Sequence, residues 1–315
     1  MPQQLLRICP ICSNTEGEIL HSIVISGASS LIGSALALTA LTRGFKVICF
    51  AQKNSARLKY IPNEAKAFFT NLDEYKHLEI NETCDLFFHL AWQKTDLAKR
   101  DDIYSQMQNI QYTLDAVHLA KRLGCKKFVG IGSQAEYGLV SEPLTASTPA
   151  NPQSGYGIAK LAAGQLSRLL ASQLGMQHNW VRILSVYGFD GNENSIINYC
   201  IKKLQAGEPP ELTPCEQVWD FLHSIDSANA LLDIGEKGID GKTYVLGSGE
   251  KRKLKDYISA IKNIVNPNIA LQFGKKEYYP HQPMYLCADI SELANDTGWK
   301  PKISFEDGIK MMLKN

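Results

Sequence analysis

The sequence lacks an excess of charge of either sign. Its 315 residues include 33 lysines and arginines and 32 aspartates and glutamates, which leaves a formal net charge of +1. A nucleic-acid-binding domain would carry a clearly positive balance or a basic patch. The even balance of positive and negative residues excludes a nucleic-acid-binding surface of this kind. We therefore expect no nucleic-acid partner and a ligand that is recognised by local contacts.

Long apolar runs are missing as well. No stretch reaches the roughly 18 consecutive apolar residues that a membrane-spanning helix requires. Cysteines, Pro10 and polar residues interrupt the apolar stretch near the amino terminus, which makes it a poor secretory signal. We therefore expect a cytoplasmic protein with no membrane partner. Six cysteines without paired spacing are typical of free thiols in a reducing compartment; they are Cys49, Cys84, Cys125, Cys200, Cys215 and Cys287.

Clusters of metal ligands are scarce. Cys9 and Cys12 form one Cys-x-x-Cys pair, which is half of a structural zinc site. The sequence has no second such pair, and His21 is only a possible third ligand. We expect no metal, and we interpret residues 1–21 as an N-terminal extension.

Short apolar runs alternate with longer helix-period segments along most of the chain. Helical patterns end at Gly44, at Gly124 and near Leu174. This alternation predicts an α/β fold with a doubly wound parallel sheet. The predicted strands are residues 21–26, 46–51, 65–70, 85–90, 127–132 and 178–184, and two of the predicted helices are residues 103–123 and 156–174.

The regular alternation of predicted strands and helices becomes less clear after about residue 187. Loop signals lie at 207–214, and a further strand is predicted at 243–246. Shorter helices are predicted at 254–265, 290–297 and 305–313. We expect a dinucleotide-binding domain over residues 22–186, to which 219–249 returns, and a smaller substrate-binding lobe within 187–315.

A glycine-bearing turn separates the first predicted strand from the helix that follows it. Glycines permit a close backbone approach, and the helix amino terminus presents amide groups to a pyrophosphate. Ser30 replaces the middle glycine of the usual Gly-x-x-Gly-x-x-Gly pattern, and its hydroxyl either caps the helix or binds a phosphate oxygen. The turn reads Gly27, Ala28, Ser29, Ser30, Leu31, Ile32 and Gly33.

Tyr156 and Lys160 are four residues apart in a predicted helix, so both lie on one helix face. A tyrosine has a pKa of about 10 in water. We expect the nearby ammonium to lower the pKa of Tyr156 towards neutrality, so that the phenol exchanges a proton with a substrate oxygen. Ser133, at the end of the fifth predicted strand, is the third candidate catalytic residue.

These motifs resemble an extended short-chain dehydrogenase/reductase of the nucleotide-sugar epimerase/dehydratase/reductase group. The resemblance covers about residues 22 to 315, and its segments follow one another in the order found in the group. They are 27–33, 85–92, 132–138 with Tyr156 and Lys160, 180–188, 219–223 and 298–301. The resemblance implies a Rossmann fold and a homodimer built from helices 103–123 and 157–174.

The resemblance also implies roles for individual residues. Tyr156 is the proton donor or acceptor, Lys160 also binds the nicotinamide ribose, and Ser133 holds the reacting oxygen. Cofactor contacts are implied for Asn71, Leu72, Leu90, Ala91 and Trp92, of which Leu72, Leu90 and Ala91 could equally be core residues.

The end of the second strand discriminates between cofactors. An acidic residue there binds the ribose 2′-hydroxyl of NAD, whereas basic residues accept the 2′-phosphate of NADP. Residues 50–57 contain no acid and include Gln52, Lys53 and Arg57. NADP is therefore favoured, although NAD is possible and both basic side chains could simply be solvated.

The substrate side departs from the family pattern at two positions. Ser185 stands where many relatives have an asparagine, and Trp219 where many have an arginine. Gln134 and Ala135 follow Ser133 where dehydratases of the group usually have an acidic pair. The predicted activity is NAD(P)H-dependent reduction of a nucleotide-linked 4-keto-6-deoxy sugar for surface-polysaccharide synthesis, with Gln134, Ser185 and Trp219 as substrate contacts. The alternatives are a 4-epimerase with tightly bound NAD and a non-catalytic cofactor-binding protein.

Overall fold

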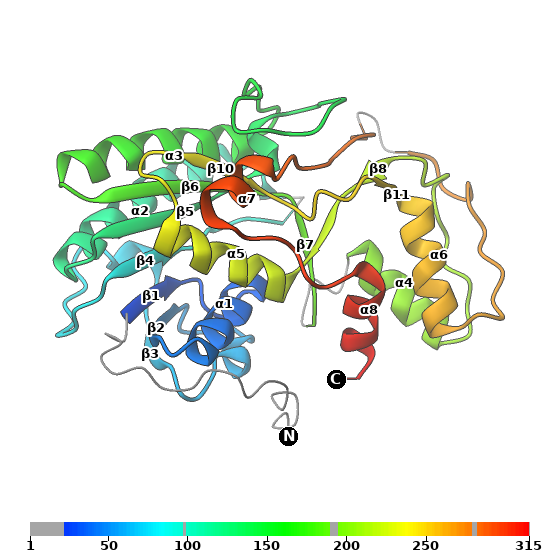
Figure 1. Ribbon diagram of the computed structural model, residues 1–315, viewed down its shortest axis with the longest axis horizontal. Coiled ribbons are helices and arrows are strands. Elements are labelled where there is room, and N and C mark those ends of the chain that lie inside the picture. Colours follow the sequence, from blue (N-terminus) through cyan, green and yellow to red (C-terminus); the bar gives the residue numbers. More distant parts are fainter. Residues whose placement is uncertain (1–21, 97–98, 190–194, 279–281, 315) are drawn as a thin grey trace.

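A seven-stranded parallel sheet organises the structure, a computed structural model that describes residues 22–96, 99–189, 195–278 and 282–314 (Figure 1). The predicted doubly wound α/β fold is confirmed. Cys9, Cys12 and His21 lie outside the described residues. In sheet order the strands are β3 (Lys66–Phe69), β2 (Lys46–Ala51), β1 (Ser22–Ser26), β4 (Leu86–His89), β5 (Lys127–Ser133), β6 (Gln177–Ile183) and β10 (Thr243–Leu246).

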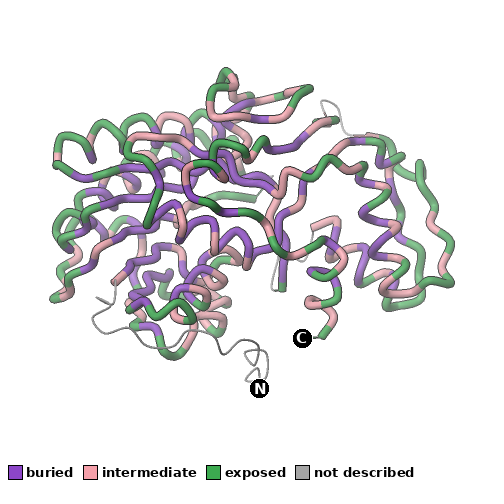
Figure 2. The backbone as a smooth tube through the Cα atoms, in the orientation of Figure 1, coloured by how far each residue is buried: buried purple, intermediate pink, exposed green. Residues whose placement is uncertain are grey.

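Helices cover both faces of this sheet. α1 (Leu31–Thr42) and α5 (Ser224–Lys237) lie on one face, and α2 (Ile103–Arg122) and α3 (Gly155–Gln173) lie on the other (Figure 1). Successive strand residues point to opposite faces, so Ile23 and Ile25 join the core under α1 while Val24 joins the core under α2. All strands of the sheet except the edge strand β3 are consequently buried along nearly their whole length (Figure 2).

A second, smaller group of elements lies to the right of the sheet in Figure 1 and has its own buried core (Figure 2). Tyr257 and Phe305 stand at its centre, with ring centroids 4.5 Å apart. Its elements are α4 (Ile196–Gln205), α6 (Leu254–Val265), α8 (Phe305–Leu313), and the paired strands β8 (Val218–Trp219) and β11 (Arg252–Lys253). Two more paired strands, β7 (Ser185–Tyr187) and β9 (Phe221–His223), join it to the sheet region.

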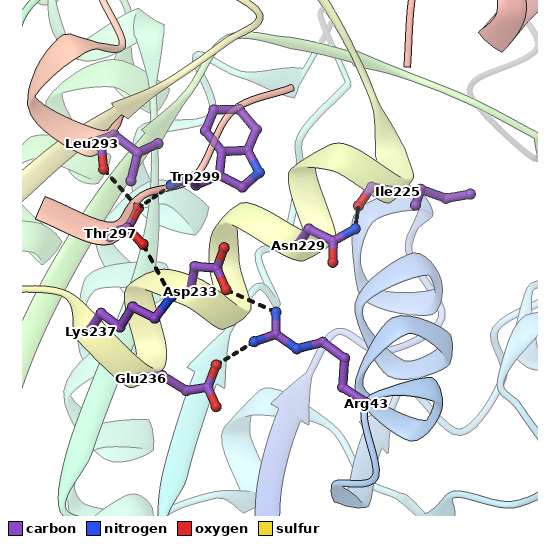
Figure 3. Close-up of polar contacts among 9 residues, drawn as sticks. All are labelled: Arg43, Ile225, Asn229, Asp233, Glu236, Lys237, Leu293, Thr297 and Trp299. Carbon is purple, nitrogen blue, oxygen red and sulfur yellow. Dashed lines mark hydrogen bonds and ion pairs between the residues drawn. The ribbon is translucent and has the colours of Figure 1, made fainter. Parts of the chain in front are cut away.

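The sequence patterns did not predict α4 or α5. α5 contains Gly235, which ordinarily weakens a helix interior, but a Cβ atom there would lie 2.7 Å from the ring of Phe88. The glycine thus allows α5 to approach the sheet closely. Charges then fix α5 against its neighbours: Arg43, at the end of α1, pairs with Asp233 and Glu236 (Figure 3).

The short helix α7 (Ser291–Thr297) packs on the other side of α5. The Nζ atom of Lys237 donates to the Thr297 carbonyl at 3.2 Å (Figure 3). None of the helices that the structure describes combines the length and apolar character needed to cross a bilayer. The six cysteines within the described ranges are free and buried.

The Trp180 ring fills a space that glycines leave open between β5, β6 and α3. Cβ atoms on Gly130, Gly132 or Gly164 would collide with the indole, at 2.6 Å in the case of Gly164. A glycine in a helix interior usually costs about 1 kcal/mol relative to alanine. At Gly164 the usual preference of a helix for alanine is opposed by the cost of displacing the rigid, buried Trp180 ring.

We therefore predict that Gly164→Ala destabilises the protein by about 1 to 2 kcal/mol, because overpacking outweighs the gain in helix propensity. The measurement is urea unfolding followed by circular dichroism. Gln165→Ala, at the exposed neighbouring position, is the control and should change the free energy of unfolding by less than about 0.5 kcal/mol. A more stable Gly164→Ala variant would contradict the packing argument.

Candidate active site

A cavity of about 370 Å³ opens where β1, β4, β5 and β6 end. The chain continues from β1 to β2 on one side of the sheet and reaches β4 on the other, so the strand order reverses between β1 and β4. Ligands of doubly wound sheets bind outside the carboxyl ends of the strands at such a point. The fold therefore places the cavity where a dinucleotide is expected.

The glycine-bearing turn closes tightly over the end of β4. Gly27 has a φ of +75°, and a Cβ atom there would lie 2.7 Å from the amide nitrogen of Ala91. Ser30 is the N-cap of α1, and its hydroxyl accepts a hydrogen bond from the Gly33 amide at 3.0 Å. Of the two roles considered for the Ser30 hydroxyl, the structure supports helix capping.

Ser133 ends β5 and begins the three-residue 3₁₀ helix η4 (Gln134–Glu136). Its hydroxyl accepts a hydrogen bond from the Ala135 amide at 3.2 Å, while its own amide donates to Glu136 Oε1 at 2.9 Å. This reciprocal capping fixes the serine at the mouth of the cavity. Glu136 was not among the predicted site residues, although the Ser-x-x-Glu spacing of a capping box would have indicated it.

Tyr156 and Lys160 lie on the first turns of α3, which Ser154 caps through a bond from the Gly157 amide. Both side chains are buried, with exposed fractions of 8% and 4%. The Nζ atom of Lys160 donates to the Ile131 carbonyl at 2.6 Å and lies 3.7 Å from the centroid of the Trp92 ring. Trp92 also meets Tyr156 edge to face, with ring centroids 6.0 Å apart. Cation–π contact and one carbonyl thus hold the lysine in place.

The electrostatics of Tyr156 differ from the sequence-based expectation. Burial raises the pKa of Tyr156, whereas the Ser133 hydroxyl and the Arg100 charge oppose that shift. The expectation that Lys160 lowers the Tyr156 pKa towards neutrality is wrong for this structure. Burial also lowers the pKa of Lys160 to about 7, against the influence of Glu136, so near pH 7 the lysine is only partly charged.

Arg100 supplies a positive charge beside Tyr156. Its guanidinium carbon lies 4.8 Å from the centroid of the phenol ring, and its Nε atom donates to the Thr95 carbonyl at 3.0 Å. Arg100 and Thr95 both line the cavity but were not predicted. They belong to an irregular segment after β4 that carries no motif, so the sequence offered no signal for them.

At the expected adenine end of the cofactor site, the basic side chain of Arg57 lies against the glycine-bearing turn. Arg57 donates from Nε to the Ser29 carbonyl at 2.9 Å, and its guanidinium lies 4.7 Å from the Tyr60 ring centroid. Its buried Nη2 atom finds no hydrogen-bond partner among the described residues. Lys53 instead forms an ion pair with Glu74.

The other predicted cofactor residues at this end have mixed surroundings. Leu72 is buried in the core cluster under α2, which is the core alternative considered from the sequence. Asn71 precedes the short helix η2 (Leu72–Glu74), and its amide donates to Glu74 Oε2 at 2.7 Å. Gln52 is exposed.

The two positions that depart from the family pattern contact one another. The indole Nε1 of Trp219 donates to the Ser185 hydroxyl at 2.9 Å, which links β8 to β7. Ser185 lines the cavity, whereas Trp219 packs between the core of the smaller lobe and a second cluster that includes Tyr137 and Val245. The structure thus combines the packing role of Trp219 with a polar contact.

The cavity brings together residues predicted from several separate motifs. Those that line it are Ser30, Leu31, Ile32, Leu90, Trp92, Ser133, Gln134, Tyr156, Lys160 and Ser185. Those that do not line it are Gly27, Ser29, Gly33, Gln52, Lys53, Arg57, Asn71, Leu72, Ala91 and Trp219.

These residues fit a nicotinamide dinucleotide. A pyrophosphate would lie against the amides at the start of α1, and the unpartnered Nη2 atom of Arg57, whose Nε atom donates to the Ser29 carbonyl, suits an anionic group beside the glycine-bearing turn. The Lys160 ammonium and the Tyr156 phenol line the same cavity as Ser30, Leu31 and Ile32 at the start of α1.

Comparisons with known proteins agree with this geometry. The sequence model of the NAD dependent epimerase/dehydratase family matches residues 23–247. The chain is 27% identical over 243 residues to a dTDP-6-deoxy-L-talose 4-dehydrogenase (NAD(+)) of Aggregatibacter actinomycetemcomitans, which covers 74% of this chain and 87% of that protein. It is 24% identical over 305 residues to a CDP-abequose synthase of Salmonella muenchen, which covers 94% of this chain and 98% of that protein.

The fold is also similar to that of a solved UDP-glucose 4-epimerase of Thermotoga maritima in complex with UDP-glucose. The TM-score is 0.82 at 21% identity, over 93% of this chain and 97% of the epimerase. The family match extends over most of the sheet and includes the glycine-bearing turn, Ser133, Tyr156 and Lys160. The resemblance inferred from these motifs is confirmed, and the chain belongs to the NAD dependent epimerase/dehydratase family.

Proposed function

We propose that this protein uses NADPH to reduce the keto group of a nucleotide-linked 4-keto-6-deoxy sugar. The observation that carries the proposal is the convergence of Ser133, Tyr156 and Lys160 on one cavity beside the glycine-bearing turn. When bound, reduced nicotinamide supplies a hydride to the keto carbon. The rest of the chemistry falls to side chains of the chain itself.

Tyr156 is the proton donor in this mechanism. Because burial raises its pKa, the phenol keeps its proton at neutral pH and can pass it to the carbonyl oxygen as negative charge develops there. The Ser133 hydroxyl donates a hydrogen bond to the same oxygen and polarises the carbonyl. The product is an alcohol, and Tyr156 regains a proton from solvent.

Charges beside the phenol stabilise the phenolate that this transfer leaves. Arg100 lies over the phenol ring, and Lys160 is held on the same helix. Lys160 and Tyr156 would also hold the nicotinamide ribose, and the amides at the start of α1 would hold the pyrophosphate. Gln134 and Ala135 are not acids, which favours simple reduction over dehydration.

A 4-epimerase is the second candidate, because the family is named for epimerases and a solved UDP-glucose 4-epimerase has a similar fold. An epimerase returns the hydride to the sugar and retains its nicotinamide through each turnover. The absorbance spectrum of freshly purified protein distinguishes the two activities: a retained and unconsumed cofactor supports the epimerase, and an empty protein that binds added NADPH supports the reductase.

We expect the purified protein to oxidise NADPH when given a panel of nucleotide-linked 4-keto-6-deoxy sugars, as measured by absorbance at the nicotinamide band. Tyr156→Phe should lower kcat by at least about 100-fold, because the proton donor is lost. Tyr112→Phe, on α2 away from the cavity, is the matched control and should retain activity within about twofold. Absence of oxidation with every substrate of the panel would refute the proposed reduction.

The preference for NADP over NAD is proposed to depend on Arg57 rather than on Lys53. Arg57 has an unpartnered buried nitrogen, whereas Lys53 is already paired with Glu74. A guanidinium binds a phosphate with two parallel hydrogen bonds. The 2′-phosphate of NADP is the group that this side chain suits.

We expect Arg57→Ala to raise the Kd for NADPH by at least about tenfold while that for NADH changes by less than about threefold. Quenching of tryptophan fluorescence on titration gives both constants. Lys53→Ala serves as the control for loss of a nearby positive charge and should have the smaller effect on NADPH. Equal weakening of the two cofactors by Arg57→Ala would argue against phosphate recognition.

We further propose that a second copy of the chain packs on the outer face of α2 and α3. Large apolar side chains are exposed along this face: Ile103, Tyr104, Met107, Ile158, Leu166 and Leu169. A hollow of about 760 Å³ lies between the two helices and is lined by Leu166 and Leu169 among others. Exposed apolar surface of this extent is typical of an interface, and the family resemblance implies a homodimer there.

Light scattering on a sizing column should therefore give the mass of a dimer for the wild-type protein at micromolar concentration. Replacing Leu166 and Leu169 together by Glu should give a monomer, because buried unpaired carboxylates oppose association. Ile239→Glu, at an exposed apolar position in the connection between α5 and β10, should leave the dimer intact. A monomeric wild-type protein would exclude this interface.

A further inference from the structure

One buried carboxylate lies directly behind the proposed catalytic residues. Glu136 is fully buried, with 0% of its surface exposed. Oε1 accepts hydrogen bonds from the Ser133 amide at 2.9 Å and from the Trp180 indole at 3.0 Å, and Oε2 accepts one from Arg182 Nε at 2.7 Å. The donors come from the end of β5 and from β6. Glu136 thus binds two neighbouring strands together at the edge of the cavity.

The indole that Glu136 holds is itself in contact with the catalytic helix. Trp180 lies against Gly164 of α3 so closely that a Cβ atom there would be 2.6 Å from its ring. The Lys160 ammonium lies 6.0 Å from the Trp180 ring centroid. A shift of the Glu136 carboxylate would therefore be transmitted both to Ser133 and to the helix that carries Tyr156 and Lys160.

The charge of Glu136 also acts on this helix. It raises the pKa values of Lys160 and Tyr156, because a nearby negative charge favours the protonated form of each group. Other groups face the pair from the surrounding elements. Arg182 on β6 pairs with Glu136, Arg100 lies over Tyr156, and His89 on β4 is neutral at pH 7 because burial lowers its pKa to about 3.

The geometry points to Glu136 as a positioning residue of the active site, which fixes the Ser133 backbone and the Trp180 ring and places a negative charge behind Lys160. This inference rests on the proposed reductase function for its kinetic consequence. Its structural part does not depend on turnover. The two parts can therefore be tested separately on the same full-length variants.

Two substitutions separate the effect of the Glu136 charge from that of its side-chain length. Glu136→Gln keeps an oxygen that can accept from Ser133 and Trp180 but removes the negative charge. Glu136→Asp keeps the charge beside Arg182 but is one methylene shorter, so it draws back from the Ser133 amide. Trp180→Phe is the control for charge, since it keeps the carboxylate while it removes one hydrogen bond to Glu136 and part of the ring that packs against Gly164.

The first readout is the pKa of Lys160. It is measured by an NMR pH titration of protein with isotope-labelled lysine side chains, and Lys160→Met identifies the Lys160 signal. We expect Glu136→Gln to lower this pKa by at least about one unit, a tenfold change in the protonation equilibrium. The value should stay within about 0.3 units in Glu136→Asp and Trp180→Phe, because both retain the carboxylate. An unchanged Lys160 pKa in folded Glu136→Gln would overturn the inference.

The second readout is the pH dependence of kcat for sugar reduction. In Glu136→Gln the alkaline limb should move to lower pH in step with the Lys160 pKa, because the ammonium is then lost at lower pH. Glu136→Asp should lower kcat by at least about tenfold with KM within about threefold, because the Ser133 amide loses its acceptor. An Asp variant with wild-type kcat would contradict the positioning role.

Circular dichroism establishes first which variants fold. If Glu136→Gln does not fold, the kcat of Glu136→Asp tests the inference. If neither variant folds, Glu136 supports the fold as a whole and the inference is wrong. If the wild-type protein reduces no substrate, the proposed function fails while the Lys160 titration still tests the role of Glu136.

Discussion

The contact of the Trp180 ring with the glycines around it is the constraint on which the active-site side of the sheet depends. Gly130 and Gly132 of β5 and Gly164 of α3 leave a space of the shape of the indole. Since the ring is rigid, it limits how closely α3 can approach β5 and β6. The single polar atom of the ring is satisfied by Glu136, so the same residue completes the packing and the hydrogen bonding.

In this arrangement, burial shifts the pKa values of Tyr156 and Lys160 more than neighbouring charges do. Tyr156 and Lys160 are both removed from water, which favours the neutral form of each. A neutral phenol is a proton donor, whereas a lysine with a pKa of about 7 contributes only part of a charge. Arg100, at the mouth of the cavity, supplies the charge that the Tyr-x-x-x-Lys spacing alone would assign to Lys160.

Much of the fold could be predicted from the sequence, because most of its strands are buried on both faces and most of its helices are amphipathic. β2, β10, α6 and α8 begin and end where the patterns predict. α5 was missed because its fit depends on Gly235 lying against Phe88, a contact between distant segments that no local pattern encodes. Sequence patterns also grouped Ser133, Tyr156 and Lys160, but Arg100 and the pKa of Tyr156 depend on spatial neighbours.

The path of the chain has a consequence for how the protein is made. The polypeptide enters the smaller lobe after β7, returns to the sheet to add β10 beside β6, and then enters the lobe again. During synthesis, six strands are therefore available well before the seventh, and Trp180, Val181 and Arg182 present an unpaired strand edge until residues 243–246 are released. Exposed edges of this kind recruit other chains. In the nascent protein the edge of β6 is therefore open to pairing with other chains until β10 covers it.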